Sequence, residues 1–177
     1  SKLEFQGMIA NVGLRLDYLD VNDQWWNYPT WPLAFKQRVP TLNQEFEKNP
    51  TDAQIHPSPR VGVSFPVTED SKLYFNYGHF RNMPNPDELF GIQQSLQGGI
   101  DQMGNPGLTM PKTVAYELGF DQNLADMFLL RISGFYRDIR DQPRDIDFTN
   151  LDGSVQYFKS LPWNYEDIRG AEISLNK

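Results

Sequence analysis

Four aromatic side chains gather in one short segment that also carries two prolines. Trp25, Trp26, Tyr28 and Trp31 lie within seven residues of one another. Exposed rings on a proline-stiffened loop can stack on sugars or clamp an apolar ligand at a low cost in conformational entropy. The same rings could instead pack against a neighbouring loop or lie at a membrane surface. We therefore take these four residues as candidate ligand-binding residues, with loop packing as the alternative.

Residue types that catalyse reactions or bind metals are sparse. The chain has no cysteine, and its two histidines, His56 and His79, are not at a metal-ligand spacing. No phosphate-binding loop, GxSxG or HExxH motif occurs. These absences predict a protein that is not an enzyme, with no catalytic residues, no metal site and no cofactor.

Aspartates are dense between residues 138 and 152, where they alternate with arginines. Asp138, Asp141, Asp145, Asp147 and Asp152 offer oxygen ligands of the kind that Ca²⁺ prefers. The segment lacks the Asp-x-Asp-x-Asp-Gly spacing of a calcium loop, and its arginines neutralise the charge. We expect a solvated loop held by ion pairs.

The overall composition argues against one class of partner and indicates the type of secondary structure. The formal net charge is −7, which argues against nucleic acid as a partner. Aromatic residues make up 14% of the chain although apolar residues reach only 39%, a balance that suits strands. No apolar run reaches 18 residues, so a transmembrane helix is excluded, whereas a membrane β-barrel is compatible with this composition.

Hydrophobic periodicity of two dominates the chain and predicts six antiparallel strands. Within residues 112–121, for example, Val114, Tyr116 and Leu118 alternate with Ala115 and Glu117. The predicted strands cover residues 8–19, 58–66, 72–80, 112–121, 127–138 and 166–176. The sequence therefore predicts an all-β, antiparallel up-and-down meander.

The connections between these strands alternate strictly between short and long. Residues 67–71 and 122–126 are short links, whereas residues 20–57, 80–111 and 138–166 are long. Outer-membrane barrels show this asymmetry, with short periplasmic turns and long extracellular loops. One helix is expected in the second long loop, capped by Asn85 and ended by the glycines at 98–99. We therefore expect part of a transmembrane β-barrel.

Aromatic residues lie near many strand ends, where they could form the girdles of a membrane barrel or make ordinary cross-strand pairs. If the apolar faces meet lipid, five charged residues face the lumen, because an arginine at mid-membrane costs about 2–4 kcal/mol. These predicted lumen-facing residues are Arg15, Arg60, Glu117, Arg131 and Glu172.

An ordered set of motifs carries a family resemblance along nearly the whole chain. It comprises the segments Gly13–Tyr18, Ser58–Thr68, Leu73–Phe80, Gly104–Thr113 with Tyr116–Phe120, Gly134–Asp141 and Ile168–Leu175. Together they resemble the later barrel strands of TonB-dependent receptors, most closely those of Bacteroidota-type bacteria. The segment before Tyr116 is similar to the family's "GNPxLxPE-T" pattern, although Lys112 stands where glutamate is common.

The resemblance implies a barrel of about 22 strands with an N-terminal plug, in the outer membrane of a Gram-negative bacterium. Such receptors take up a scarce ligand, such as a siderophore or glycan, with energy passed on by TonB through the plug. Six strands cannot close so wide a barrel, so we expect a fragment cut at both ends, in contact with outer-membrane lipid and a small extracellular ligand. The alternative is a soluble secreted β-sandwich or lipocalin-like carbohydrate binder, which would require a dry, two-layer interior.

Overall fold

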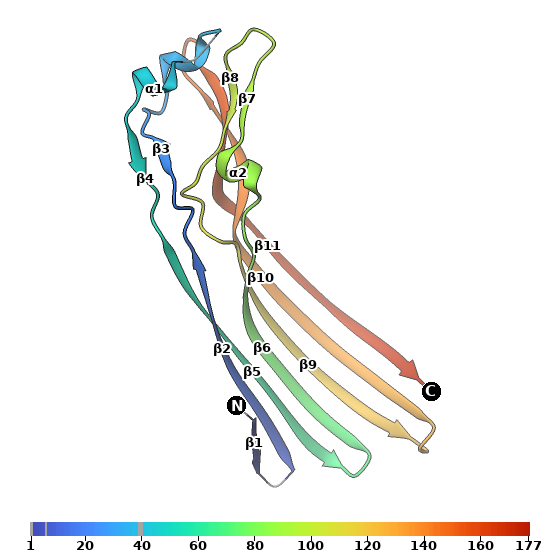
Figure 1. The fold of residues 1–177 in the computed structure, drawn as a ribbon. Coiled ribbons are helices and arrows are strands. Elements are labelled where there is room, and N and C mark those ends of the chain that lie inside the picture. The colour runs from blue at the N-terminus through green and yellow to red at the C-terminus, as the bar shows by residue number, and fades with distance from the viewer. Residues whose placement is uncertain (1, 6, 39–40) are drawn as a thin grey trace.

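The computed structural model describes residues 2–5, 7–38 and 41–177. Six long strands form an antiparallel meander, which confirms the predicted fold class. In sheet order they are β2 (Met8–Leu19), β5 (Gln54–Thr68), β6 (Ser71–Arg81), β9 (Lys112–Leu124), β10 (Phe128–Thr149) and β11 (Gln156–Asn176). Figure 1 shows them as one curved, twisted sheet that does not close into a barrel.

Short turns lie at one end of this sheet and long connections at the other (Figure 1). The turn between β9 and β10 places Ala125 and Asp126 at positive φ values of 52° and 56°. Two consecutive residues with positive φ form the type of tight turn whose twist matches that of antiparallel strands. The predicted alternation of long and short connections therefore holds for the first four connections, from β2 to β10.

The predicted long connection 138–166 is mostly strand. β10 continues to Thr149 and β11 begins at Gln156, so the two strands form one long hairpin. The prediction was wrong here because both faces of this part of the hairpin carry polar residues. The backbone ladder continues where the hydrophobic alternation, which marked the strand in the sequence, has stopped.

The helix in the second long connection is shorter than expected. α2 covers only Pro86–Phe90; it begins at the predicted cap residue Asn85, which forms a capping box with Glu88. Gly91 ends the helix, and a hairpin of β7 (Ile92–Gln94) and β8 (Ile100–Met103) follows. Leu96, which falls within the helix expected from the sequence, is fully exposed at the hairpin tip.

Smaller elements complete both ends of the sheet. At the short-turn end, β1 (Lys2–Phe5) pairs with the first residues of β2, and at the long-connection end β3 (Gln24–Trp26) pairs with β4 (Lys48–Pro50) (Figure 1). A 3₁₀ helix covers Leu33–Lys36, and α1 covers Leu42–Glu45. β8 joins the main sheet by parallel pairing with β11. No helix among the described residues is long and apolar enough to cross a membrane.

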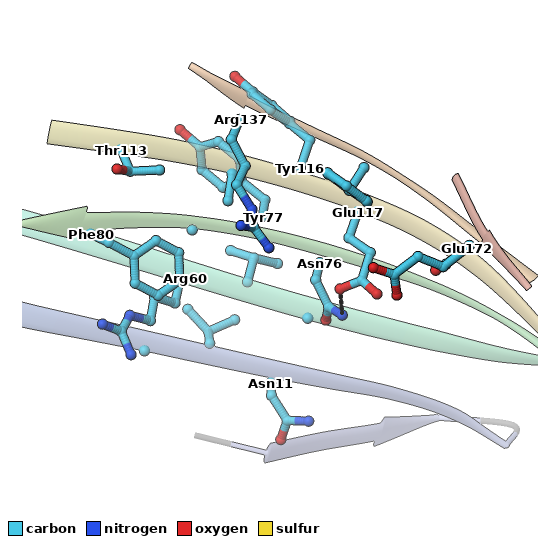
Figure 2. Close-up of a pocket in the computed structure, with 18 of the residues that line it drawn as sticks. Asn11, Arg60, Asn76, Tyr77, Phe80, Thr113, Tyr116, Glu117, Arg137 and Glu172 are labelled. Carbon is cyan, nitrogen blue, oxygen red and sulfur yellow. Dashed lines mark hydrogen bonds between the residues drawn. The ribbon is translucent and has the colours of Figure 1, made fainter. Parts of the chain in front are cut away.

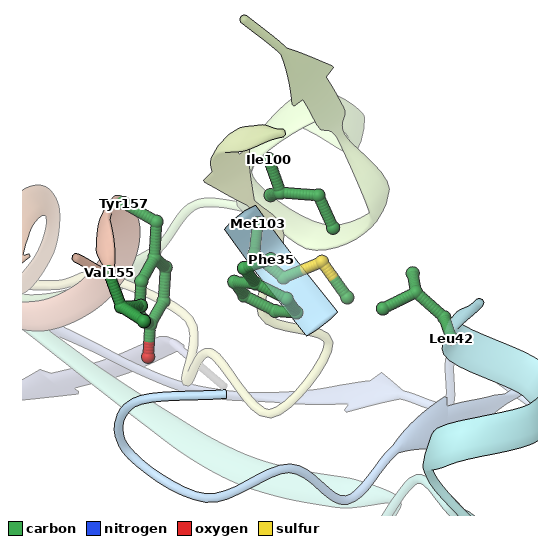
Figure 3. Packing of buried hydrophobic residues seen from close by; sticks show 6 residues of the cluster. All are labelled: Phe35, Leu42, Ile100, Met103, Val155 and Tyr157. Carbon is green, nitrogen blue, oxygen red and sulfur yellow. The ribbon is translucent and has the colours of Figure 1, made fainter. Parts of the chain in front are cut away.

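The hydrophobic core lies at the long-connection end of the molecule. We call it the loop cluster; its buried members are Phe35, Leu42, Ile100, Met103, Val155 and Tyr157 (Figure 3). Away from that end, many large apolar side chains of the six strands stay open, with Leu118 53% and Ile173 74% exposed. The described residues place no second layer against them, so the dry interior that a soluble sandwich requires is absent.

Candidate functional site: two faces of the sheet and a loop cluster

One face of the sheet carries polar side chains around a large groove, which we call the polar-face groove. Its volume is about 980 Å³. Strand alternation brings polar residues from six strands to it: Asn11, Arg60, Asn76, Glu117, Arg137 and Glu172 (Figure 2). Because successive residues point to opposite sides of a sheet, these residues share one face and their apolar neighbours share the other.

Hydrogen bonds order the floor of the polar-face groove. Glu117 accepts hydrogen bonds from the Tyr74 hydroxyl and the Asn76 amide, each at 3.2 Å. Arg60 stacks over the Phe80 ring at 4.5 Å from its centroid, and Arg137 lies over Phe135 at 5.2 Å. The groove therefore presents fixed charges of both signs.

A buried carboxylate ties three strands together on the same face. Asp121 on β9 accepts two hydrogen bonds from Arg131 on β10, at 2.8 and 3.1 Å. Lys72 on β6 lies 3.4 Å from the same carboxylate, whose side chain is only 4% exposed. Paired guanidinium and carboxylate groups of this kind fix geometry as well as supplying energy.

All five predicted lumen-facing residues fall on the polar face. Arg60, Glu117 and Glu172 line the polar-face groove, and Arg131 lines a smaller hollow beside it. Arg15 lies outside both and pairs with Asp17 at 2.7 Å. The sequence analysis missed the aromatic residues of this face, Tyr74, Phe80 and Phe135, because rings at polar positions of an alternating strand interrupt the pattern.

The opposite face is apolar and ends in a row of tyrosines. Tyr77, Tyr116 and Tyr136 are register partners on three neighbouring strands. Their ring centroids are 5.1 and 6.2 Å apart. The rings thus make cross-strand pairs and, at the same time, form the kind of belt seen where barrels meet lipid headgroups.

The polar boundary of this apolar face runs obliquely across the strands. The register row Val12–Val61–Tyr77–Tyr116–Tyr136–Arg169 serves as a reference. On β11 the first charge toward the long connections is Arg169 itself, whereas after β2 it is Asp20, eight residues beyond Val12.

The slope of this boundary gives the tilt of the strands. Eight residues correspond to about 26 Å along a strand, and the five spacings between β2 and β11 to about 24 Å. A boundary with that slope is level only if the strands are inclined by about 45°. Transmembrane barrels incline their strands by about 35–45°.

Three of the four candidate aromatic residues pack against the loop cluster. Trp25, Trp26 and Tyr28 are half-buried and pack against it, whereas Trp31 is 49% exposed. Trp26 donates its indole N–H to Asn43 at 3.0 Å, and the Tyr28 ring lies 5.1 Å from Phe35. The structure therefore joins three of the four rings to the protein interior and leaves Trp31 on the surface.

Burial shifts the ionisation of the groups around these rings. Desolvation raises the pKa of Tyr28 and raises the pKa of Tyr157 to about 12. Lys159 lies over the Tyr28 ring at 4.9 Å, and burial lowers the pKa of its ammonium group. The interior of the cluster therefore favours neutral groups.

The aspartates of residues 138–152 make hydrogen bonds and ion pairs along the β10–β11 hairpin. Asp147 accepts hydrogen bonds from Thr149 and Gln156, and Asp138 pairs with Arg140 at 2.8 Å. Among residues 2–5, 7–38 and 41–177, no three metal-binding side chains come together.

Comparison with known proteins agrees with this geometry. The family model described as TonB dependent receptor-like, beta-barrel, matches residues 3–176. No curated protein matches the chain.

Solved structures with the same fold are receptors and transporters. One is a double mutant of the Serratia marcescens hemophore receptor HasR, in complex with its hemophore HasA and heme. It is 17% identical, with a TM-score of 0.67, over 99% of this chain and 30% of that one. The ferric enterobactin receptor PfeA from Pseudomonas aeruginosa, a G324V mutant, is 16% identical with a TM-score of 0.67, over 97% and 22%. The FrpB iron transporter from Neisseria meningitidis is 16% identical with a TM-score of 0.61, over 98% and 22%.

The chain spans less than a third of the length of each of these proteins. At such low identity the likeness shows the fold alone, whereas the family model covers nearly every residue. The single-layer sheet, the oblique apolar band and this match lead to one conclusion: the chain belongs to the TonB-dependent receptor-like β-barrel family.

Proposed function

We propose that this chain is a stretch of barrel wall in an outer-membrane receptor that takes up a scarce ligand. The observation that carries the proposal is the oblique apolar band on a sheet without a second layer. Large apolar side chains exposed to this degree, such as Leu14 at 68% and Ile173 at 74%, need a nonpolar surrounding. Acyl chains supply it if the strands cross the membrane at the tilt that the band indicates.

In this orientation the polar face lines the lumen. Arg15, Arg60, Glu117, Arg131 and Glu172 then face a plug domain, through which the TonB complex would act on the full-length receptor. The polar-face groove supports this role because it offers fixed charges of both signs to a folded domain. The proposed activity is transport, and it assigns no catalytic step to any residue of the chain.

The long connections then form the extracellular entrance for ligand. The neighbouring structures include receptors for ferric enterobactin and for a heme-carrying hemophore as well as the copper transporter OprC, which supports a scarce, metal-containing cargo. Trp31 is the exposed ring of the aromatic segment and the best candidate for contact with such a ligand. Trp25, Trp26 and Tyr28 would hold that loop in place.

Cysteines introduced on opposite faces test the orientation directly, since the chain has none of its own. In the full-length protein in membranes, Leu118→Cys should react with a lipid-soluble maleimide and resist a charged one. Its neighbour Glu117→Cys should show the opposite preference, because it points into the polar-face groove. Equal labelling of both positions by the charged reagent would contradict the proposal.

A further inference from the structure

A hollow interrupts the apolar face just below the tyrosine row. Its volume is about 580 Å³, and the apolar-face residues around it are Phe75, Tyr116, Leu118, Gly134, Tyr136 and Arg169. One register row across the strands runs Phe75, Leu118, Gly134 and Ala171. The hollow exists because the last two of these residues are small. A Cβ atom at Gly134 would meet only the Gly170 carbonyl oxygen, at 3.9 Å.

Three neighbouring strands each carry a cation near this hollow: Arg169 lies at its rim, and Lys112 and Arg140 lie farther toward the long connections. Lys112 and Arg140 are register partners, and Arg169 is the partner of Tyr136. The side chains of Arg140 and Arg169 are 68% and 77% exposed. Among the described residues, no carboxylate lies within ion-pair distance of Lys112.

Two carboxylates lie in the same region. They are one fewer than the three cations, so the region keeps a net positive charge. Asp138 and Asp167 are register partners. Asp138 pairs with Arg140 at 2.8 Å, and Asp167 pairs with Arg169 at 3.3 Å. Arg81, at the end of β6, donates a hydrogen bond to the Met110 carbonyl and forms an ion pair with Asp141. Three cations against two carboxylates favour an anionic partner.

We propose that the hollow and the three cations form a seat for a phosphorylated glycolipid of the lipid A type. One acyl chain fills the hollow over Gly134, and the phosphates lie against Arg169, Arg140 and Lys112. The cations span two interstrand spacings, roughly 10 Å, which suits a headgroup with more than one phosphate. Tyr116 and Tyr136 share a register row with Arg169 and separate the hollow from Lys112 and Arg140, at a level where aromatic rings meet lipid headgroups.

This inference rests on the proposed orientation of the apolar face toward lipid, and its test is separate. The full-length receptor, purified in detergent and incubated with bisphosphorylated lipid A, would be examined by native mass spectrometry. Gly134→Leu fills the hollow, and Arg169→Gln removes one cation. Each is expected to lower the retained lipid A about fivefold, as expected from the loss of about 1 kcal/mol of binding free energy.

Two variants serve as matched controls and should retain lipid A as the unmodified protein does. Ala10→Leu adds a side chain in the same register row as Gly134 but on β2, away from the hollow. Arg15→Gln breaks a comparable ion pair between residues i and i+2, on the polar face.

Three results would overturn the inference. One is equal retention of lipid A by all variants, which would leave the orientation measured with Leu118→Cys untouched. A second is equal retention of phosphatidylglycerol, which would mean that any anionic lipid suffices. The third is full competition by inorganic pyrophosphate, which would mean that the hollow plays no part.

Discussion

At the scale of single residues, Tyr157 connects the loop cluster to the aromatic segment. It is 2% exposed, and its hydroxyl donates to the Thr30 carbonyl at 2.8 Å. Its pKa is about 12 in the folded protein, against 10.0 for a free side chain. The stability that the neutral phenol contributes is therefore complete below pH 10 and is lost as the pH rises from 10 to 12.

Tyr157→Phe should reduce this loss of stability at alkaline pH. The reduction should be partial, because Tyr28, whose pKa is also raised by burial, still ionises. At neutral pH the variant should lose about 1 kcal/mol with the hydrogen bond. Tryptophan fluorescence of the full-length protein, titrated from pH 8 to 12, reports the opening of the cluster. An identical titration for both proteins would show that Tyr157 ionises freely.

Asp121 is a second residue whose contribution to stability depends on its burial. Asp121→Asn leaves Arg131 and Lys72 without their shared carboxylate and should lower the free energy of unfolding by about 1–3 kcal/mol. Glu4→Gln, which breaks an exposed pair with Lys2, should cost at most about 1 kcal/mol. Urea titration of the full-length protein in detergent compares the two, and similar small losses would contradict the assigned role of Asp121.

At the scale of elements, rings that cover glycines fix how neighbouring strands pack. Tyr74 on β6 lies over its register partner Gly119 on β9, where any Cβ atom would overlap the ring. Gly119→Val should therefore cost about 1–3 kcal/mol through overpacking. Gly13→Val, on the same face with open space around its Cβ position, should be close to neutral or slightly stabilising.

The Gly119 experiment has an internal check. Combining Gly119→Val with Tyr74→Ala removes the overlapping ring, so the double variant should recover part of the loss in a double-mutant cycle. Strictly additive effects of the two substitutions would mean that the ring and the glycine do not interact.

At the scale of the whole molecule, the oblique band sets the depth of each residue in the membrane. Leu14 and Val114 each lie two residues beyond the same register row, toward the long connections. If the strands tilt by about 45°, Leu14 lies well inside the hydrocarbon and Val114 near its boundary. Leu14→Arg should then cost about 2–4 kcal/mol and Val114→Arg about 0–1 kcal/mol.

Folding titrations of the full-length protein into lipid vesicles measure both costs. Equal costs at the two positions would indicate strands that run straight across the membrane, and the proposed tilt would be wrong. A higher cost for Val114→Arg would reverse the direction of the tilt.

Much of the wall could be predicted from the sequence, and the loop cluster could not. Alternation at Val114, Tyr116 and Leu118 is local, because each residue's face follows from its neighbours. The packing of Trp25, Trp26 and Tyr28 depends on partners far along the chain, such as Tyr157, whose hydroxyl reaches Thr30 across 127 residues. Nothing in the aromatic segment itself encodes that contact.

The sequence alone determined the two faces of the sheet, its antiparallel meander of six strands and the positions of its two short turns, since period-two patterning marks each strand and the breaks in that patterning mark the turns. Only the tertiary structure decided the long β10–β11 hairpin, the hollow at Gly134 and the slope of the apolar band. Each of these depends on register, the lateral alignment of one strand against the next. The alternation along one strand excludes a shift by one residue, which would move every side chain to the other face, but it allows a shift by two. Contacts between the strands decide among these even shifts.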